Sequence, residues 1–190
     1  MGGLVLVSGT ARAAPSTWFL VESAAGLASG DDVGASPTLL TEVAAGATFK
    51  WHGVLFYTLL TGAFRSTSAE ARFEGLAFET TQDQLDLFFA PRVVFPIYRG
   101  TRVYLELGSG ARWTEGSIDR GPNLGTVGVR SVAPTLIAAA GLSFRPMARV
   151  SFGVRAELSS TLGTPSPLAA LAGRPDSSRS AALFTVGLHF

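Results

Sequence analysis

The chain has 190 residues, of which 47% are hydrophobic and only 15% are charged, and its net charge is +1. This balance leaves no basic footprint for nucleic acid, and no run of about 18 apolar residues is present to form a transmembrane helix. Cysteine is absent, which excludes disulfides, thiol catalysis and thiolate metal sites.

The first residues have the features of a processing segment. Leu4 to Val7 form a short apolar patch, and Ala11-Arg12-Ala13 fits the small-x-small rule for a secretory cleavage site. We therefore interpret residues 1–13 as the remnant of a secretory signal peptide and residues 14–190 as the folded domain. An ordinary flexible terminus is the alternative.

Eight segments alternate between apolar and polar residues with period two, which is the pattern of a half-buried strand. Each supplies the roughly 9–11 residues that a tilted strand needs to cross a bilayer. The third is apolar on both faces, so its register is the least determined. The segments span residues 17–27, 39–51, 54–65, 82–95, 101–115, 129–144, 149–162 and 178–190.

The seventh segment alternates most clearly. One of its faces carries Val150, Phe152, Val154, Ala156 and Leu158, and the other carries Arg149, Ser151, Gly153, Arg155 and Glu157. In the last segment, Phe190, Leu188, Val186 and Phe184 share a face. The two faces of each strand are therefore predicted to meet different environments.

The connections alternate between short and long. Tight turns are predicted at residues 51–53, 96–100 and 145–147, and longer links at 28–38, 66–81, 116–128 and 163–177. This alternation is typical of an up-and-down barrel with short periplasmic turns and long external loops. Arg174 and Arg179 are then expected in the last external loop, open to protease, and the aromatic residues near the short turns are expected to form an interfacial girdle.

The predicted inward face carries charges of both signs among small residues. Eight strands leave an interior that side chains can fill, so such charges must pair. Folding the fourth and fifth segments about Tyr98 places Arg92 diagonal to Glu106 and Asp86 diagonal to Arg112, with Gly108 and Gly110 making room for the long side chains. The inward charges are Glu22, Glu42, Lys50, Asp86, Arg92, Arg102, Glu106, Arg112, Arg149, Arg155 and Glu157.

This face has two interpretations. A salt-bridged plug would make the barrel solid, and we favour it; a gated, charge-lined pore for small solutes is the alternative. The two histidines, His52 and His189, lie at the short-turn end, so no general base is expected near the long loops. The sequence predicts no enzyme, no cofactor and no metal site.

The chain ends on Phe190 inside an alternating strand, and in this it resembles the small OmpA/OmpX-type eight-stranded outer-membrane barrels. The resemblance covers residues 15–190 and implies an all-β, eight-stranded antiparallel up-and-down transmembrane β-barrel in the bacterial outer membrane. It implies that Phe190, with Leu188, belongs to the signal read by the barrel-assembly machinery, and that outer-membrane lipid surrounds the protein. A structural or surface-interaction role follows, with any ligand at the long loops unspecified.

Two alternatives concern the barrel itself. A soluble lipocalin-like barrel would invert the faces, with aliphatic side chains around a ligand and charges in water. The small residues on the charged face, and a single lysine in the chain, argue against it. Ten strands would result if residues 69–79 formed an additional hairpin within the bilayer, whereas we expect this segment to extend above it.

Overall fold

The computed structural model describes residues 18–30, 37–52, 54–73, 76–119, 125–163 and 178–190. These residues form β-strands joined by short connections. Within these ranges, no helix is long and apolar enough to cross a membrane. The proposed signal remnant at residues 1–13 and the protease site at Arg174 lie outside the described residues.

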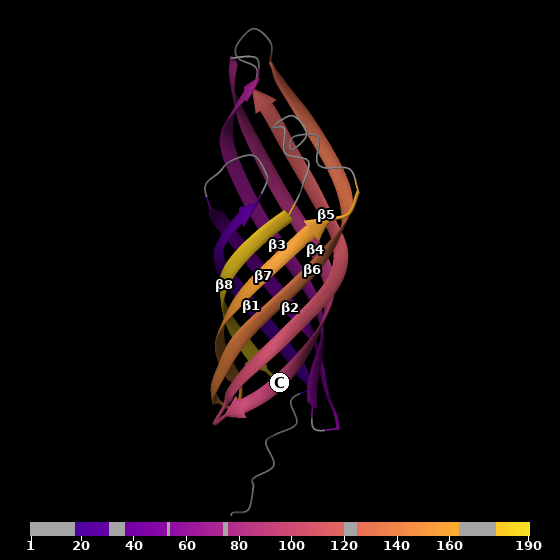
Figure 1. Cartoon of the computed structure of the whole chain (residues 1–190), viewed down its shortest axis with the longest axis vertical. Coiled ribbons are helices and arrows are strands. Elements are labelled where there is room, and N and C mark those ends of the chain that lie inside the picture. Colours follow the sequence, from indigo (N-terminus) through magenta and orange to yellow (C-terminus); the bar gives the residue numbers. More distant parts are fainter. Residues whose placement is uncertain (1–17, 31–36, 53, 74–75, 120–124, 164–177) are drawn as a thin grey trace, which may run out of the picture.

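Eight antiparallel strands form one closed barrel in chain order, as predicted, and β1 pairs with β8 to complete the ring (Figure 1). Consecutive strands are neighbours throughout, which is the up-and-down topology. Residues 69–73 and 76–79 belong to the paired strands β3 and β4 and add no further strands. The strands are β1 (Phe19–Gly30), β2 (Thr38–Trp51), β3 (Val54–Phe73), β4 (Leu76–Tyr98), β5 (Thr101–Asp119), β6 (Thr126–Met147), β7 (Val150–Thr161) and β8 (Ser178–His189).

The two faces of the barrel wall differ as the alternation predicts. In β7, Val154 is exposed on the outside whereas Arg155 is buried in the lumen. The ambiguous third segment also has a defined register, because Leu59 is fully buried inside and Leu60 is exposed outside. Aliphatic side chains therefore cover the outer wall, while charged and small side chains occupy the interior.

The hairpin between β4 and β5 places its charges directly opposite each other. Arg92 pairs in register with Glu106, and Asp86 with Arg112. The prediction of diagonal neighbours was wrong because the hairpin is centred on Arg99, not on Tyr98. The register shifts between Pro96 and Tyr98, and this irregularity moves the whole ladder by one step.

Four strands continue beyond the barrel as an extended sheet (Figure 1). Residues 66–73 of β3, 76–84 of β4, 113–119 of β5 and 126–134 of β6 form this part, which we call the blade. The sequence predicted links at 66–81 and 116–128, and this was wrong for most of their length. The charged residues lie on the outward face of the blade, and polar residues such as Thr67, Gln82 and Thr114 interrupt its inward face, so no continuous apolar face marked these residues as strands.

The lumen contains two clusters of buried apolar side chains. One cluster lies toward the short-turn end and consists of Leu20, Tyr57, Leu59, Val94 and Tyr104. The other includes Ala24, Leu40, Phe88, Ile137 and Leu183. The charged side chains fill the lumen together with these clusters.

Candidate functional site: a charge-filled lumen and an open sheet edge

The structure buries all eight charged residues that the sequence assigned to the interior network. Each is at most 5% exposed, although all carry a charge in their ordinary ionised form. Such burial is tolerated only when opposite charges and hydrogen bonds compensate for lost hydration. The eight are Glu22, Glu42, Asp86, Arg92, Glu106, Arg112, Arg155 and Glu157.

Three further charges predicted to face inward lie at the end of the barrel. Lys50 and Arg149 are exposed, and Arg102 is half-buried. They occupy inward-facing positions in the alternation, but they lie beside the short turns, where the lumen opens to solvent. The alternation predicted their face and not their depth.

Arg92 holds the first part of the network together. Its Nη1 and Nη2 donate to both carboxylate oxygens of Glu22 at 3.0 and 2.7 Å, and its Nε donates to Glu106 Oε2 at 2.8 Å. The guanidinium also lies over the ring of Tyr104, with Cζ 4.2 Å from the ring centroid. Arg92 therefore joins β4 to β1 across the lumen as well as to its neighbour β5.

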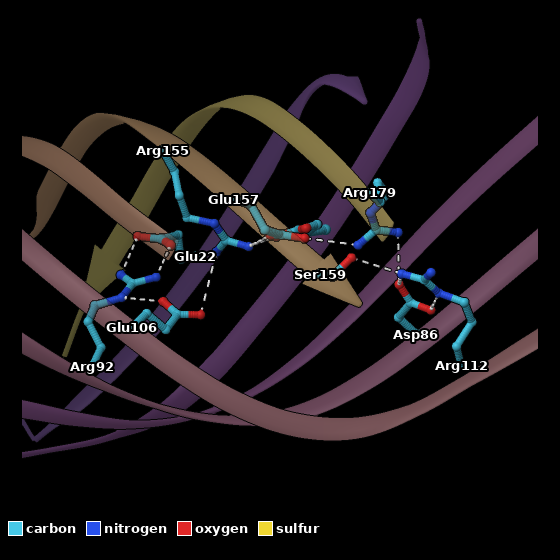
Figure 2. Close-up of polar contacts among 10 residues, drawn as sticks. Glu22, Asp86, Arg92, Glu106, Arg112, Arg155, Glu157, Ser159 and Arg179 are labelled. Atoms are coloured by element: carbon cyan, nitrogen blue, oxygen red, sulfur yellow. Dashed lines mark hydrogen bonds and ion pairs between the residues drawn. The ribbon is translucent and has the colours of Figure 1, made fainter. Parts of the chain in front are cut away.

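Arg155 and Arg179 extend the network along the axis (Figure 2). Arg155 Nη2 contacts the carboxylates of Glu42 and Glu157, and its Nη1 lies 3.8 Å from Glu106 Oε1. Arg179 donates from Nη2 to Glu157 Oε1 at 2.9 Å and from Nη1 to Asp86 Oδ2 at 2.8 Å. The chain of contacts is thus continuous from Glu22 to Asp86.

The far end of the network is the pair of Asp86 and Arg112. Arg112 donates from Nε to Asp86 Oδ1 at 2.8 Å, and from Nη2 to Asp86 Oδ2 at 3.0 Å and Ser159 Oγ at 2.9 Å. Ser159 is one of the members that the sequence did not indicate. The two-point contact between Arg112 and Asp86 fixes the orientation of both side chains.

Arg179 corrects a prediction. The sequence placed it in an external loop open to protease, whereas it lies in β8 and is 2% exposed inside the barrel. Arg65 is also buried inside, and the sequence analysis did not select it although it ends the third segment. Both lie within predicted segments, at their long-loop ends, so applying the alternation up to the last residues of each segment would have found them.

Glycines allow this packing, but Gly108 and Gly110 do so by a different means from the one predicted. Side-chain atoms added at Gly108 or Gly110 would collide with the backbone of β4, so these glycines permit close strand approach and do not accommodate the arginine side chains. Gly141 is the residue that makes room for a side chain. A Cβ there would overlap the Tyr104 ring, which also lies against the Arg92 guanidinium.

The outer wall excludes the lipocalin-like alternative. Leu107, Val154 and Leu158 are more than half exposed on the same strands whose charges are buried. Large aromatic side chains are exposed beside the short turns, where a membrane interface would lie. These are Phe49, Trp51, Phe95, Tyr98, Phe144 and Phe190.

The blade has two edges that no neighbouring strand covers among the described residues. β2 pairs with β3 only as far as Leu40 opposite Arg65, and β7 pairs with β6 only from Thr135 onward. Pro134 marks the end of pairing, since its carbonyl accepts the last hydrogen bond, from Leu162 N at 2.7 Å. The backbone of residues 126–133 of β6 is therefore open on one side.

The two histidines lie at the short-turn end, as the sequence indicates. His52 is exposed in the turn after β2, and His189 is buried with Nε2 2.9 Å from Ser151 Oγ. Within the described part of the chain, no group of three or more His, Asp or Glu side chains is arranged to hold a metal ion.

No protein-family model matches the sequence, and no curated protein matches it. Solved structures do match. A major outer-membrane protein of Thermus thermophilus aligns with a TM-score of 0.63 at 13% identity, covering 92% of this chain and 100% of that one. Neisserial surface protein A aligns with a TM-score of 0.54 at 12% identity, over 90% of this chain and 97% of that one.

The attachment invasion locus protein Ail of Yersinia pestis aligns with a TM-score of 0.51 at 14% identity, over 92% of this chain and 97% of that one. The chain therefore has the fold of the small eight-stranded outer-membrane β-barrels. The resemblance inferred from its sequence is confirmed at the level of fold.

Proposed function

We propose that the protein is a closed surface barrel of the bacterial outer membrane. Its barrel would anchor the blade outside the cell, and the blade would bind an extended segment of another protein. The apolar outer wall supports the membrane location. The filled lumen supports a role other than transport, and both histidines at the short-turn end support a role other than catalysis.

The observation that carries this proposal is the open edge of β6. In an antiparallel ladder the amide and carbonyl of one residue point toward the same neighbour, and alternate residues point the same way. The Pro134 carbonyl points toward β7, so the backbone groups of Val132, Arg130 and Gly128 point out of the open edge. A peptide strand could pair with these groups by strand addition.

The β6 edge suits such pairing better than the β3 edge. Residues 126–133 read Thr-Val-Gly-Val-Arg-Ser-Val-Ala, with Arg130 as the only charge. That charge is bound by Glu115 of β5, with Arg130 Nη2 2.7 Å from Glu115 Oε1. The sequence of residues 66–73 contains two charges, one of which is acidic, and charged edge strands disfavour strand addition.

One pair of variants tests the strand-addition mode. Eight-residue peptides would be selected from a random library on the full chain in detergent. Arg130→Pro removes the outward amide and should abolish binding of the selected peptides, whereas Arg130→Ala removes only the side chain and should retain it. Equal binding by both variants, or a selection that yields no binders, would contradict the mode.

Orientation is tested with single cysteines, because the chain has none of its own. Ser68→Cys in the blade should react with a membrane-impermeant maleimide on intact cells, and Arg99→Cys in a short turn should react only after lysis. The reverse pattern would show that the blade lies in the periplasm.

The runner-up function is a narrow channel, for which the interior charges would line a pore. Continuous pairing from Glu22 to Arg112 disfavours it, and we expect planar bilayers containing the protein to show no steady conductance. Large, stable, voltage-independent openings would favour the channel.

We further propose that outer-membrane lipid and the barrel-assembly machinery are the partners of the barrel part. Phe190 and Leu188 would belong to the signal that the machinery reads. The exposed position of both side chains on the outer wall of the closing strand supports this assignment.

A further inference from the structure

The side chains at the short-turn mouth of the barrel include positive charges and no negative ones. Among the described residues, every acidic side chain belongs either to the lumen network or to the blade, and none lies in the short turns or beside them. Residues 95–103 and 143–152 contain no Asp or Glu, and the same holds for residues 47–56. The cations at this mouth are Lys50, Arg99, Arg102, Arg145 and Arg149.

Arg102 and Arg145 form the centre of this group. Arg102 lies opposite Ser143 in the β5 and β6 ladder, and the Arg145 amide donates to the Gly100 carbonyl at 3.0 Å. The two side chains therefore come from adjacent strands and share the inward face, where both are half-buried. Two like charges so placed repel each other unless an anion lies between them.

Neither arginine has a carboxylate partner, in contrast to the arginines deeper in the lumen. Among the described residues, no acid lies within ion-pair distance of Arg102 or Arg145. Arg145 Nε donates only weakly, to the Met147 carbonyl at 3.4 Å. Most of the donors of both guanidinium groups are thus available to a ligand.

A small cavity of about 20 Å³ lies next to these two arginines. Its lining includes Arg102, Arg145, Ser143, Tyr104 and His189, together with Glu22, whose carboxylate is already bound by both Nη atoms of Arg92. Tyr104 Oη and His189 Nδ1 are buried there without a hydrogen-bond partner in the protein. The cavity has room for a single water-sized group, which is the size of one oxygen of a larger anion.

We propose that this mouth is an oxyanion site for a phosphate group, with Arg102 and Arg145 as its two ligands. Arginine presents paired N–H donors that match phosphate oxygens, and the surrounding cations raise the local concentration of anions. One phosphate oxygen would reach the cavity beside Tyr104 and His189. The phosphate is either that of an anionic phospholipid headgroup or a soluble phosphate.

The test uses the full chain in uncharged detergent, with inorganic phosphate followed by calorimetry at constant ionic strength. Arg102→Gln with Arg145→Gln should weaken binding about tenfold or more, because two charge-assisted contacts are lost. Arg130→Gln, which removes an exposed arginine from the blade, should leave binding unchanged. Retention of the heat-dependent shift in gel mobility verifies that each variant is folded.

A charge-conserving variant separates a built site from diffuse attraction. Arg102→Lys with Arg145→Lys keeps the net charge but loses the paired donors, so it should also bind phosphate less tightly. Affinity equal to that of the original chain in this variant, or in the glutamine variant, would overturn the proposal. The proposal would also be overturned if the original chain bound neither inorganic phosphate in calorimetry nor phosphatidylglycerol in the lipid assay described next.

The lipid assay distinguishes the two sources of phosphate. The protein would be placed in nanodiscs of phosphatidylcholine with a minor fraction of phosphatidylglycerol, and the lipid that stays bound would be counted. Enrichment of phosphatidylglycerol that the glutamine variant loses assigns the site to headgroups. Binding of inorganic phosphate without such enrichment assigns it to a soluble phosphate.

Discussion

The barrel and the blade share the four strands β3 to β6, yet different rules govern their side chains. In the barrel, β5 buries Glu106 and Arg112 in the lumen and exposes Leu107 outside. In the blade, the same strand exposes Glu115, which pairs with Arg130 in solvent. The backbone ladder continues unbroken from one part to the other, with Glu106 opposite Ala139 and Glu115 opposite Arg130.

This difference teaches that side-chain alternation reports the surroundings of a strand and not the strand itself. Where lipid lies on one side and a packed lumen on the other, the pattern is strong. In the blade, the outward face carries charged side chains and the inward face buries polar ones such as Thr80 and Gln82, yet the ladder continues. The variants below separate these two situations, beginning with the largest expected effect.

Closure of the barrel should be most sensitive to the last residue. Phe190 N donates to the Phe19 carbonyl at 3.0 Å and its carbonyl accepts from Trp18 N at 2.7 Å, so this residue helps to close the ring. We expect Phe190→Asp to abolish nearly all heat-modifiable barrel in membranes. Ile118→Asp in the blade is the control and should leave the level unchanged. Normal levels of the Phe190 variant would remove its proposed role in assembly.

Breaking the lumen network should have a smaller effect than blocking assembly, but it should still lower the free energy of unfolding substantially. Glu106→Ala leaves Arg92 with Glu22 alone and removes a carboxylate from Arg155. Loss of one partner of a buried pair typically costs about 3–5 kcal/mol. Urea unfolding in detergent should show a clear drop in midpoint, and bilayer recordings should show new leakage.

Adding Arg92→Ala to the Glu106→Ala variant sharpens the result. The second change removes the charge that Glu106 had compensated, so part of the stability should return. Recovery should be incomplete because Glu22 then loses its partner. A double variant whose loss equals the sum of the two single losses would show that the residues do not act as a pair.

Two outward valines with similar exposure should respond differently to charge. Val154 in the barrel is 56% exposed and Val132 in the blade is 63% exposed. An arginine on the lipid face at mid-depth costs about 2–4 kcal/mol, so Val154→Arg should lower the free energy of unfolding in lipid vesicles by that amount. Val132→Arg should have almost no effect. Equal losses would mean that both sites meet the same solvent.

The smallest effect is expected from the exposed ion pair of the blade. Arg130 and Glu115 are 81% and 63% exposed in their side chains, and such pairs contribute about 0–1 kcal/mol. Glu115→Ala should therefore shift the unfolding midpoint barely above error. A loss comparable to that of Glu106→Ala would show that the blade is packed against something that shields the pair from water.

Much of the barrel could be predicted from the sequence because the pattern is local. Period-two alternation assigns Val154 to one face and Arg155 to the other without knowledge of any distant residue. The partners Arg92 and Glu106 follow from a short hairpin, although the predicted register was off by two residues along β5. A bulge at Ile97 is a backbone event that residue types do not specify uniquely.

The length of the strands and the composition of the lumen network were less accessible. Ser68, Thr80 and Thr81 lie in β3 and β4 although their polar composition predicted a link. Arg179 was assigned to a loop for the same reason. In both places the neighbouring strands impose the conformation, and the residue types by themselves are neutral.

The sequence by itself determined the fold class, the number of strands, the face of each side chain and the need for charges to pair. These follow from local periodicity and from the cost of burying an unpaired charge. Only the tertiary structure decided which charges meet. Glu22 reaches Arg92 and Glu42 reaches Arg155 because ring closure brings strands from opposite walls to face one another across the lumen. A local sequence pattern contains no information on which strands face each other across the lumen.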